Sequence, residues 1–396
     1  MAEPVRILTL NNISHVGLKR LPQNYIIANQ VENPDGILVR SHDMHSMEVP
    51  GSVKAIGRAG AGTNNIPVAA MSARGLPVFN APGANANAVK ELVIAGLLVA
   101  ARNLVPAIRF VDDLTGSDEQ IDRQVEEGKK HYAGVELPQR TLGVIGLGKI
   151  GSLVADTAIK FGMHVTGYDP EITVDAAWGL PSQVRKAHSI EELLRAADFV
   201  TVHVPLLDST RGLLNARRIG LMKHGAILLN FAREGIVERD AVLEALASRR
   251  LKYYVCDFPG EKLVGNPAVI ALPHLGASTQ EAEDNCAVMV VDQLRDYLEH
   301  GNIRNAVNFP EVVMARESAY RLGIANANVP NMVGQISTAV ANAGLNIHNM
   351  INKSRQDMAY TLVDVDSPVP DGVIRGIAGI AGVLGVRYLP LERSDG

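Results

Sequence analysis

Residues 142–169 read LGVIGLGKIGSLVADTAIKFGMHVTGYD, and this stretch decides the fold. The apolar run at its start predicts a buried parallel strand, and Gly146 to Gly151 fit the pattern G-x-G-x-x-G. An amphipathic helix is expected to about Phe161, followed by a second strand over His164 to Tyr168. Asp169 then lies 18 residues beyond the last glycine. A strand, a glycine-rich turn, a helix and a second strand in this order predict a dinucleotide-binding unit.

Each glycine has a mechanical reason in that setting. Gly146 permits the tight turn, Gly148 lets the backbone approach a pyrophosphate, and Gly151 lets the helix pack closely on the strand. The start of the helix, at Lys149, offers free N–H groups and the positive end of its dipole to phosphates. Asp169 can accept hydrogen bonds from both ribose hydroxyls and would repel a 2′-phosphate. We therefore expect NAD rather than NADP.

Composition indicates an ordinary globular protein of two or three domains. The chain has 396 residues, of which 47% are hydrophobic and 20% are charged. The net charge of −4 and the lack of Lys/Arg blocks argue against a nucleic-acid surface. An anionic substrate would have to be bound by individual arginines.

Targeting and redox signals are weak. The first residues, MAEPVRILTLNN, do not resemble a signal peptide, and no stretch approaches 18 uninterrupted apolar residues. We expect a cytoplasmic protein with no membrane contact. Cys256 and Cys286 lie far apart without a C-x-x-C motif, so we expect buried free thiols, and we assign no metal site.

The N-terminal part alternates short strands with helices, which predicts a parallel sheet. No phosphate-binding glycine pattern follows its first strand, so this part is expected to bind substrate rather than nucleotide. A long apolar helix over Ala88 to Leu104 is expected to be buried and to join two α/β lobes. The predicted elements before it are the strands Val5–Leu10, Gly36–Val39, Val53–Arg58 and Val78–Asn80 and the helix Val68–Arg74.

After the glycine-rich turn the same alternation resumes, with strands expected at Phe199–Val204, Ala226–Phe231, Tyr253–Asp257 and Val269–Leu272. In an open parallel sheet, ligands bind at the carboxyl ends of the strands. Polar residues that could carry chemistry stand at those ends in this part of the chain: Asp169, His203, Arg233, Asp257 and His274.

The C-terminal part predicts a helix over Ser278 to Gly301, a return segment, and then a βαββαβ order over Tyr320 to Leu391. The expected fold is α/β, with two doubly wound parallel-sheet lobes and a small α+β domain. We expect a discontinuous substrate-binding domain (1–93 and 280–308), an inserted NAD-binding Rossmann domain (94–279) and a C-terminal domain (317–396).

Four ordered motifs resemble those of the D-isomer-specific 2-hydroxyacid dehydrogenases, and the resemblance covers nearly all of residues 1–308. One departure is Glu234, which stands where this family usually has glycine. The motifs are His203-Val204-Pro205 with Thr210, Leu229-Asn230-Phe231-Ala232-Arg233-Glu234-Gly235, Asp257-Phe258-Pro259-Gly260-Glu261, and Leu272-Pro273-His274-Leu275-Gly276-Ala277-Ser278-Thr279.

The resemblance implies oxidation of a D-2-hydroxy acid with NAD. A histidine titrates near neutral pH, so His274 suits the general base that removes the hydroxyl proton. Glu261 would accept the other ring N–H and so fix the tautomer. Arg233 would hold the carboxylate and the C2 oxygen, because its planar guanidinium matches two oxygens.

Further residues would position the cofactor. Asp257 would accept a hydrogen bond from the nicotinamide amide, whereas His203 could simply pack beside its proline. With the glycines and Asp169, the resemblance implies a cofactor set of Lys149, Ile150, His203, Val204, Pro205, Thr210, Ala232, Asp257, His274 and Gly276.

The N-terminal loops are similar to those of family members that oxidise D-3-phosphoglycerate at the start of serine biosynthesis. This similarity implies substrate contacts from Arg40, Ser41, Arg58 and Asn85, with Arg233 and His274. Two arginines cannot by themselves distinguish a phosphate from a second carboxylate, so another small D-2-hydroxy acid, such as 2-hydroxyglutarate, stays open. A cofactor-sensing corepressor on the same scaffold is disfavoured, because its interaction segment is absent and the Arg/Glu/His set is complete.

The C-terminal βαββαβ unit resembles an ACT domain, which implies either amino-acid sensing or assembly alone. Asn326, Asn328 and Asn346 match positions at which related ACT domains hold serine. The apolar helix before the glycine-rich strand and the pairing habit of ACT sheets suggest a homodimer or homotetramer.

Overall fold

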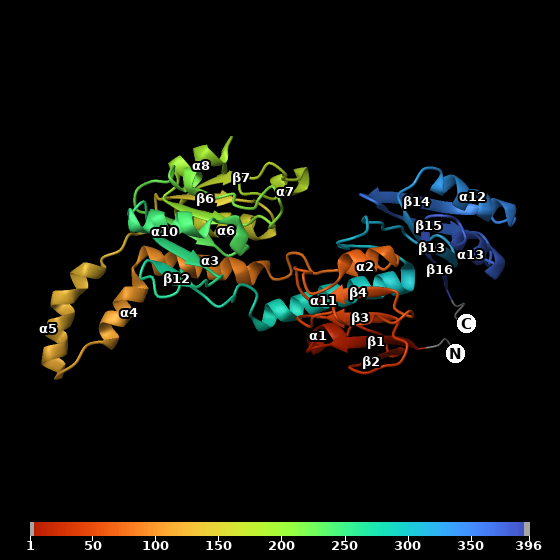
Figure 1. Cartoon of the computed structure of the whole chain (residues 1–396), viewed down its shortest axis with the longest axis horizontal. Coiled ribbons are helices and arrows are strands. Elements are labelled where there is room, and N and C mark those ends of the chain that lie inside the picture. Colours follow the sequence, from red (N-terminus) through yellow and green to blue (C-terminus); the bar gives the residue numbers. More distant parts are fainter. Residues whose placement is uncertain (1–3, 392–396) are drawn as a thin grey trace. The chain divides into compact units, whose positions relative to one another are not determined.

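The structure, a computed structural model, describes residues 4–391 and divides the chain into two compact units (Figure 1). The first unit contains Met1–Asn85 and Gln280–Gly396, and the second contains Ala86–Thr279. The second unit is therefore an insertion in the sequence of the first. Each unit has a parallel sheet with helices, and the first also has a small antiparallel sheet. The predicted fold class is confirmed.

The first unit is built on a five-stranded parallel sheet with the order β2-β1-β3-β4-β5. The central strand β3 is fully buried, as its uninterrupted small and apolar sequence predicts. Strand β2 and helix α1 are additions that the sequence pattern did not predict. The elements are β1 Val5–Leu10, α1 His15–Leu18, β2 Tyr25–Ala28, β3 Gly36–Val39, β4 Ala55–Arg58, α2 Val68–Ala73 and β5 Val78–Phe79.

Helix α11, Gln280–His300, returns the chain to the first unit and packs along its sheet (Figure 1). Its apolar residues recur every three or four positions, so one stripe of the helix is buried. That stripe contributes to a core shared with β1, β3 and β4. Its buried members include Ala282, Cys286, Val290, Leu294 and Tyr297.

The second unit contains a seven-stranded parallel sheet with the order β12-β11-β10-β9-β6-β7-β8. Strand β6 lies where the order reverses direction, which is the position of ligand crevices in such sheets. The strands are β6 Thr141–Ile145, β7 His164–Tyr168, β8 Arg185–Lys186, β9 Phe199–Val202, β10 Ala226–Asn230, β11 Leu251–Cys256 and β12 Val269–Ala271. The helices that accompany them include α3 Ala86–Ala101, α6 Lys149–Lys160, α7 Val174–Trp178, α8 Ile190–Ala196, α9 Ala216–Ile219 and α10 Arg239–Ala247.

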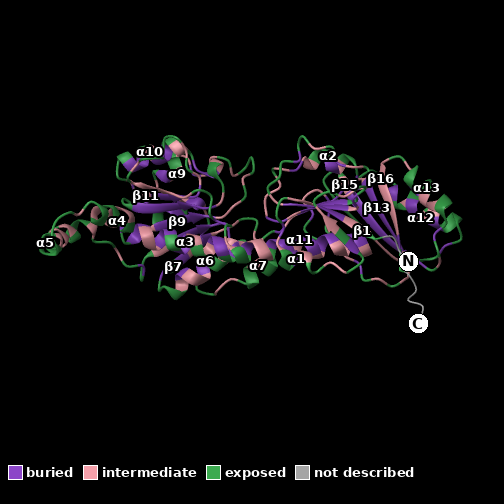
Figure 2. Cartoon of the chain, turned by 90° about the horizontal axis from the view of Figure 1, so that it is seen from below, coloured by how far each residue is buried: buried purple, intermediate pink, exposed green. Residues whose placement is uncertain are grey.

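The long apolar helix ends earlier than its hydrophobic pattern predicts. Asn103 adopts a left-handed conformation (φ 52°) and its side-chain amide donates to the carbonyls of Tyr132 and Ala133. The chain therefore turns and continues as a helical hairpin, drawn in orange in Figure 1, of α4 (Leu104–Asp112), α5 (Asp118–Gly128) and the short helix η1 (Lys129–Tyr132). Figure 2 shows this hairpin as mostly exposed or half-buried.

The C-terminal elements have the predicted βαββαβ order and form an antiparallel sheet, β14-β15-β13-β16. Arginines of this sheet tie it to the rest of the first unit. Arg321, which is fully buried and pairs with Asp364, donates to the His300 carbonyl at the end of α11, and Arg387 donates to the carbonyls of Tyr297 and Leu298 in α11. Arg355 donates to the Ala306 carbonyl. The elements are β13 Tyr320–Ala327, α12 Met332–Asn342, β14 Ile347–Arg355, β15 Met358–Val365, α13 Asp371–Ala378 and β16 Val383–Pro390.

The two cysteines, Cys256 and Cys286, are free and buried, as predicted. Within residues 4–391, no single helix is long and apolar enough to cross a membrane, and α3 and α4 pass that test only as a pair bent by 65°.

Candidate functional site

The glycine-rich turn between β6 and α6 has the geometry that a bound pyrophosphate requires. Gly146 has a positive φ of 90°, and a Cβ there would lie 2.8 Å from the His203 carbonyl. A Cβ on Gly151 would lie 1.9 Å from the Gly146 carbonyl oxygen, so both positions accept only glycine. At Gly148 a Cβ would meet no atom within 4 Å, and no side chain caps α6. The start of the helix is therefore open to a phosphate.

Asp169 directly follows β7 and organises the same turn. Its carboxylate accepts hydrogen bonds from the backbone N–H of Leu147 (2.8 Å) and of Glu171 (3.1 Å). Beside it lies a cavity of about 490 Å³, whose mainly apolar walls suit a flat aromatic base. The apolar residues of this cavity were not predicted, because they are scattered through a polar segment of the sequence: Ile172, Leu180, Val184 and Ala187.

The turn after β10 presents Arg233 and depends on a buried asparagine. Asn230 is 0% exposed; its amide donates to the Arg233 carbonyl (2.9 Å), and its oxygen accepts from the Ala232 N–H (3.1 Å). The Tyr254 hydroxyl is a further partner of the amide. The Arg233 side chain itself is exposed. Asn230 thus fixes the backbone from which the arginine projects, a role that the sequence analysis did not assign.

The loop after β12 presents His274 and is shaped by Asp257. This carboxylate is 1% exposed, and its two oxygens accept from the N–H groups of Leu275 and Gly276, both at 2.7 Å. His274 has a left-handed backbone (φ 57°), and its exposed ring meets Phe258 edge to face at 5.2 Å. The observed contacts of Asp257 therefore hold the loop that carries His274.

Glu261 follows β11 in a tight turn, where the N–H groups of Leu263 and Val264 donate to the Gly260 carbonyl. Its side chain is exposed, and in the part of the chain that the structure describes no hydrogen bond joins it to His274. Arg233, Glu261 and His274 thus follow three neighbouring strands, β10, β11 and β12, at the same edge of the sheet.

The loop after β9 carries the His203 motif. The His203 Nε2 is 3.0 Å from the Thr201 hydroxyl, and burial lowers the pKa of His203 to about 3. A neutral, half-buried imidazole whose Nδ1 is buried fits the packing interpretation rather than a proton-transferring one. The Thr210 hydroxyl donates to the Pro205 carbonyl (2.6 Å) and accepts from the Leu207 N–H (2.8 Å), so it closes the turn.

In the first unit, the structure brings three of the four predicted substrate residues together. Arg40 and Ser41 follow β3, and Arg58 ends β4 with its Nε donating to the Arg40 carbonyl (3.0 Å). Asn85 lies after β5, at the end of the unit's first segment. The Arg40 guanidinium forms an ion pair at 2.5 Å with Glu283 in the first turn of α11, a residue that the sequence analysis did not single out.

Comparisons with known proteins identify the family of this chain. Residues 101–276 match the family model described as D-isomer specific 2-hydroxyacid dehydrogenase, NAD binding domain. The chain is also 34% identical over 370 residues to the D-3-phosphoglycerate dehydrogenase of Haemophilus influenzae, covering 89% of this chain and 86% of that protein. This chain belongs to the D-isomer specific 2-hydroxyacid dehydrogenases. It is by family an NAD-dependent dehydrogenase, and NAD is its cofactor.

Two further relatives show the extent of the likeness. The D-3-phosphoglycerate dehydrogenase of Methanocaldococcus jannaschii is 37% identical over 292 residues, which are 72% of this chain and 53% of that protein. This chain therefore spans about half the length of that relative. The solved structure of the TT0316 protein from Thermus thermophilus has a TM-score of 0.62 at 29% identity, covering 76% of this chain and 100% of that one. The fold of that protein is thus shared across most of this chain.

Asp169 gives a direct test of the NAD site in this dehydrogenase. We expect Asp169→Ala to weaken NADH binding about tenfold, because two hydrogen bonds to the ribose are lost. The same change should reduce the discrimination against NADPH, since the charge that repels a 2′-phosphate is removed. Fluorescence titration with both cofactors measures this. Asp169→Asn is the control, because it removes the charge but keeps an acceptor for the Leu147 N–H; an unchanged NADH/NADPH ratio in both variants would contradict the assignment.

The three asparagines of the C-terminal sheet do not meet within one chain. Asn326 is 1% exposed near the end of β13, and its amide donates to the Ala327 carbonyl. Asn328 follows that strand and bonds to the Gln356 carbonyl. Asn346 precedes β14 and pairs with Asp366, just after the last residue of β15, whereas Asn326 lies opposite Ala359 near the start of β15. Asn346 and Asn326 are therefore at opposite ends of the sheet. A single chain of this dehydrogenase therefore does not form the expected three-asparagine site.

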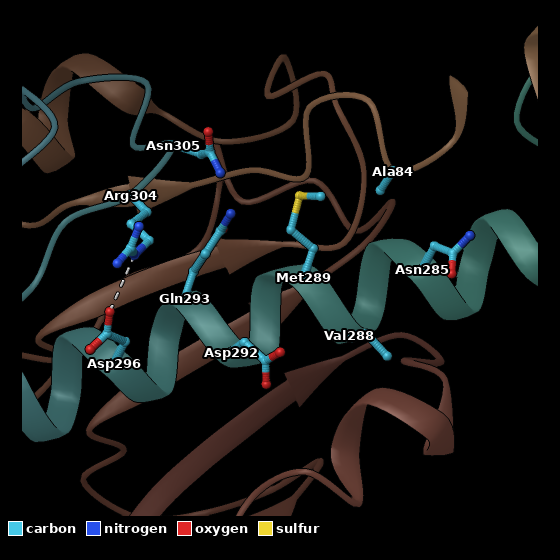
Figure 3. Close-up of a pocket in the computed structure, with 9 residues that line it drawn as sticks. All are labelled: Ala84, Asn285, Val288, Met289, Asp292, Gln293, Asp296, Arg304 and Asn305. Atoms are coloured by element: carbon cyan, nitrogen blue, oxygen red, sulfur yellow. Dashed lines mark ion pairs between the residues drawn. The ribbon is translucent and has the colours of Figure 1, made fainter. Parts of the chain in front are cut away.

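The first unit also contains a cavity of about 660 Å³ along α11 (Figure 3). Met289 and Gln293 point from the helix toward Asn305, and Asp296 pairs with Arg304 at 3.6 Å. The predicted site residues of this dehydrogenase do not line it, although Ala84 beside Asn85 does.

Proposed function

We propose that this chain oxidises D-3-phosphoglycerate to 3-phosphohydroxypyruvate with NAD, the first step of serine biosynthesis. The observation that carries the proposal is the placement of Arg233, Glu261 and His274 after the neighbouring strands β10, β11 and β12. The identity of 34% to the Haemophilus influenzae enzyme, over 89% of this chain, supports the choice of substrate.

In this mechanism His274 accepts the proton of the C2 hydroxyl group on a ring nitrogen as the C2–O bond becomes a carbonyl. Glu261 accepts a hydrogen bond from the other ring N–H, which orients the ring and stabilises its protonated form. The observed Glu261 carboxylate is exposed and makes no bond to His274, so in this proposal the contact forms when the two exposed side chains turn toward each other on binding. NAD, when bound, supplies the hydride acceptor.

Arg233 holds the substrate carboxylate and the C2 oxygen with its planar guanidinium. Its exposed guanidinium donates to the Ala232 carbonyl (2.6 Å) and exchanges that contact for the ligand on binding, while its backbone is held by Asn230. Asp257 acts on the same chemistry indirectly, since it fixes the N–H groups on the C-terminal side of His274. In this proposal Asp257 also accepts from the carboxamide of the nicotinamide, using lone pairs that the two backbone contacts leave available.

Arg40, Ser41, Arg58 and Asn85 of the first unit would bind the phosphate. The Arg40–Glu283 pair bears on this assignment, because a phosphate must compete with a carboxylate for the same guanidinium. That observation favours the second candidate, a small D-2-hydroxy acid without phosphate, such as 2-hydroxyglutarate. The two candidates share the chemistry of Arg233, Glu261 and His274 and differ only in what Arg40 and Arg58 recognise.

A substrate panel decides between them. D-3-phosphoglycerate, D-2-hydroxyglutarate and D-lactate are each incubated with the protein and NAD at alkaline pH, and NADH absorbance is followed. We expect the highest kcat/KM with D-3-phosphoglycerate. Turnover of a non-phosphorylated acid without turnover of D-3-phosphoglycerate would contradict the first proposal and support the second.

The Glu283→Gln variant tests the competition at Arg40. Removing the carboxylate releases the guanidinium for the phosphate, so we expect KM for D-3-phosphoglycerate to fall about fivefold, in line with a partly exposed ion pair. Glu281→Gln is the matched control, since it removes one negative charge from the same exposed turn without touching Arg40. A similar KM in both variants would show that Glu283 acts only through overall charge, or not at all.

The assembly proposal rests on the helical hairpin. Leu104, Ile108 and Val111 of α4 are 40%, 59% and 58% exposed, and neighbouring exposed apolar side chains are typical of an interaction surface. We propose that these residues contribute to a homodimer or homotetramer. The mass in solution, measured by light scattering, should be a multiple of 42.4 kDa; a single-chain mass would contradict it.

The C-terminal sheet is proposed to bind serine as an effector. Because Asn346 lies at the opposite end of the sheet from Asn326, the three asparagines can act on one ligand only if two copies of the sheet come together. Serine is added to the dehydrogenase assay up to millimolar concentration. An unchanged rate would leave the sheet with a role in assembly alone.

A further inference from the structure

The first two residues of α10 contact two of the three segments that carry the proposed catalytic side chains of the second unit, those of Arg233 and Glu261. Arg239 and Asp240 open this helix, after the Arg233 turn and before the Glu261 loop in the sequence. We propose that Arg239 and Asp240 are positioning residues that hold the Arg233 turn and the Glu261 loop at a fixed distance and orientation from each other. This proposal rests on the proposed function.

The first contact joins Arg239 to the turn that carries Arg233. The Arg239 guanidinium forms a hydrogen-bonded ion pair with Glu234, the residue that directly follows Arg233. The Arg239 Nε is buried and has no hydrogen-bond partner within residues 4–391. The guanidinium is therefore held by Glu234 on one side and by packing on the other.

That packing is against Gly260, the residue that directly precedes Glu261. A Cβ on Gly260 would lie 2.9 Å from the Arg239 Cζ, 3.0 Å from Nη2 and 3.1 Å from Nε. The planar group thus lies directly against the backbone of the Glu261 loop, and a side chain at position 260 would displace it. A Cβ at position 260 would push on the guanidinium that Glu234 holds, so the two contacts of Arg239 depend on each other.

A second ion pair fixes the other side of Glu261. The Lys262 ammonium lies 2.8 Å from the Asp240 carboxylate. Between the two contacts, the Gly260 carbonyl accepts from the N–H groups of Leu263 and Val264, and Leu263 is buried in the core of the unit. The residues on both sides of Glu261 are therefore held by α10: Gly260 packs against Arg239, and Lys262 forms an ion pair with Asp240.

These contacts are suited to positioning rather than to overall stability. The paired side chains are 38% and 57% exposed for Arg239 and Glu234, and 60% and 79% for Lys262 and Asp240. Ion pairs at such exposure contribute little to the free energy of unfolding. A catalytic group displaced by about 1 Å, in contrast, can slow a reaction by up to 100-fold. Loss of the contacts should appear in turnover before it appears in unfolding.

A double-mutant cycle between Arg239→Met and Glu261→Gln tests the proposal. We expect Arg239→Met alone to lower kcat about tenfold and to raise KM for the hydroxy acid, while the Kd for NADH stays unchanged. When Glu261 is already replaced by glutamine, adding Arg239→Met should lower kcat by less than a further factor of about two. The reason is that Arg239 affects kcat by positioning the Glu261 carboxylate, which the Glu261→Gln variant lacks. Fully additive losses of kcat would overturn the coupling between Arg239 and Glu261.

Three further variants separate positioning from a general structural effect. Gly260→Ala should reproduce the loss of kcat, because its Cβ pushes on the same guanidinium, and Arg239→Lys should restore part of it by keeping the charge beside Glu234. Lys160→Met removes the exposed Lys160–Asp156 pair on α6 and should leave kcat and KM unchanged. A Gly260→Ala variant with wild-type kcat would contradict the packing argument.

Amide hydrogen exchange makes the test independent of the substrate. Arg239→Met should speed exchange at Leu263 and Val264, whose N–H groups close the Glu261 turn, by about tenfold, and Lys160→Met should not. Unchanged exchange would overturn the proposal whatever the enzyme oxidises. If exchange responds as expected while none of the panel acids is turned over, the proposed function fails and the structural link between the two segments stands.

Discussion

His274→Ala is expected to lower kcat for the hydroxy acid by about 10³-fold while leaving the Kd for NADH unchanged. The imidazole is the proposed acceptor of the hydroxyl proton, and general bases contribute about 10²–10⁴-fold to such reactions. NADH binding should persist because the glycine-rich turn and Asp169 are formed by β6, α6 and β7. Stopped-flow turnover and a fluorescence titration of NADH measure the two quantities separately.

The alanine change must be separated from an effect on the loop. His274 has a left-handed backbone, and its ring meets Phe258, so His274→Asn is the companion variant, since asparagine tolerates that conformation and cannot act as a base. His224→Ala removes an exposed histidine elsewhere in the second unit and should be fully active. If His274→Asn retained wild-type turnover, another residue would be the base.

The sequence predicted the parts of the site that follow from local rules. The glycines at 146, 148 and 151 were assigned because a turn that approaches a phosphate excludes side chains, and the structure shows the corresponding close contacts at Gly146 and Gly151. The positions of Arg233 and His274 followed from the ends of apolar strands, which the alternation of strands and helices located to within one or two residues.

The parts that were missed depend on contacts between distant segments. Arg40 and Glu283 are paired, yet no local pattern links β3 to α11. In the sequence, Asn230 is simply the last residue of an apolar strand. Its buried hydrogen bonds to the backbone of Ala232 and Arg233 show that it shapes the turn that carries Arg233. The helical hairpin was not predicted because α3 ends where the Asn103 side chain donates hydrogen bonds to the carbonyls of Tyr132 and Ala133. The spacing of hydrophobic residues carries no information about such a contact between distant segments.

A similar limit applies to the C-terminal sheet. Its order of strands and helices was predicted correctly because alternation and turn residues are local signals. The positions of Asn326 and Asn346 depend on how β13 and β14 pair with β15. Both strands run antiparallel to β15, which places Asn326 and Asn346 at opposite ends of the sheet. Residue type suggested one effector site, and strand register rules it out within a single chain.

Asp364→Asn is expected to destabilise the first unit by about 3–5 kcal/mol, because it leaves a buried arginine without its counter-ion. Arg321 and Asp364 are both 0% exposed, and two hydrogen bonds of 2.6 and 2.8 Å join them. The guanidinium also donates to the carbonyls of His300, Met314 and Ala315, so it fastens the end of α11 and the following segment to the C-terminal sheet. Urea unfolding followed by circular dichroism measures the loss.

The double variant Arg321→Met/Asp364→Leu distinguishes an unpaired charge from a mere loss of contacts. Removing both charges avoids an uncompensated ion in the core, so the double variant should be more stable than Asp364→Asn, although the carbonyls that Arg321 satisfied lose their donor. Asp366→Asn is the control, since this exposed carboxylate lies two residues away and bonds only near the surface. If Asp366→Asn and Asp364→Asn unfolded at the same urea concentration, the buried pair would not be what joins the sheet to α11.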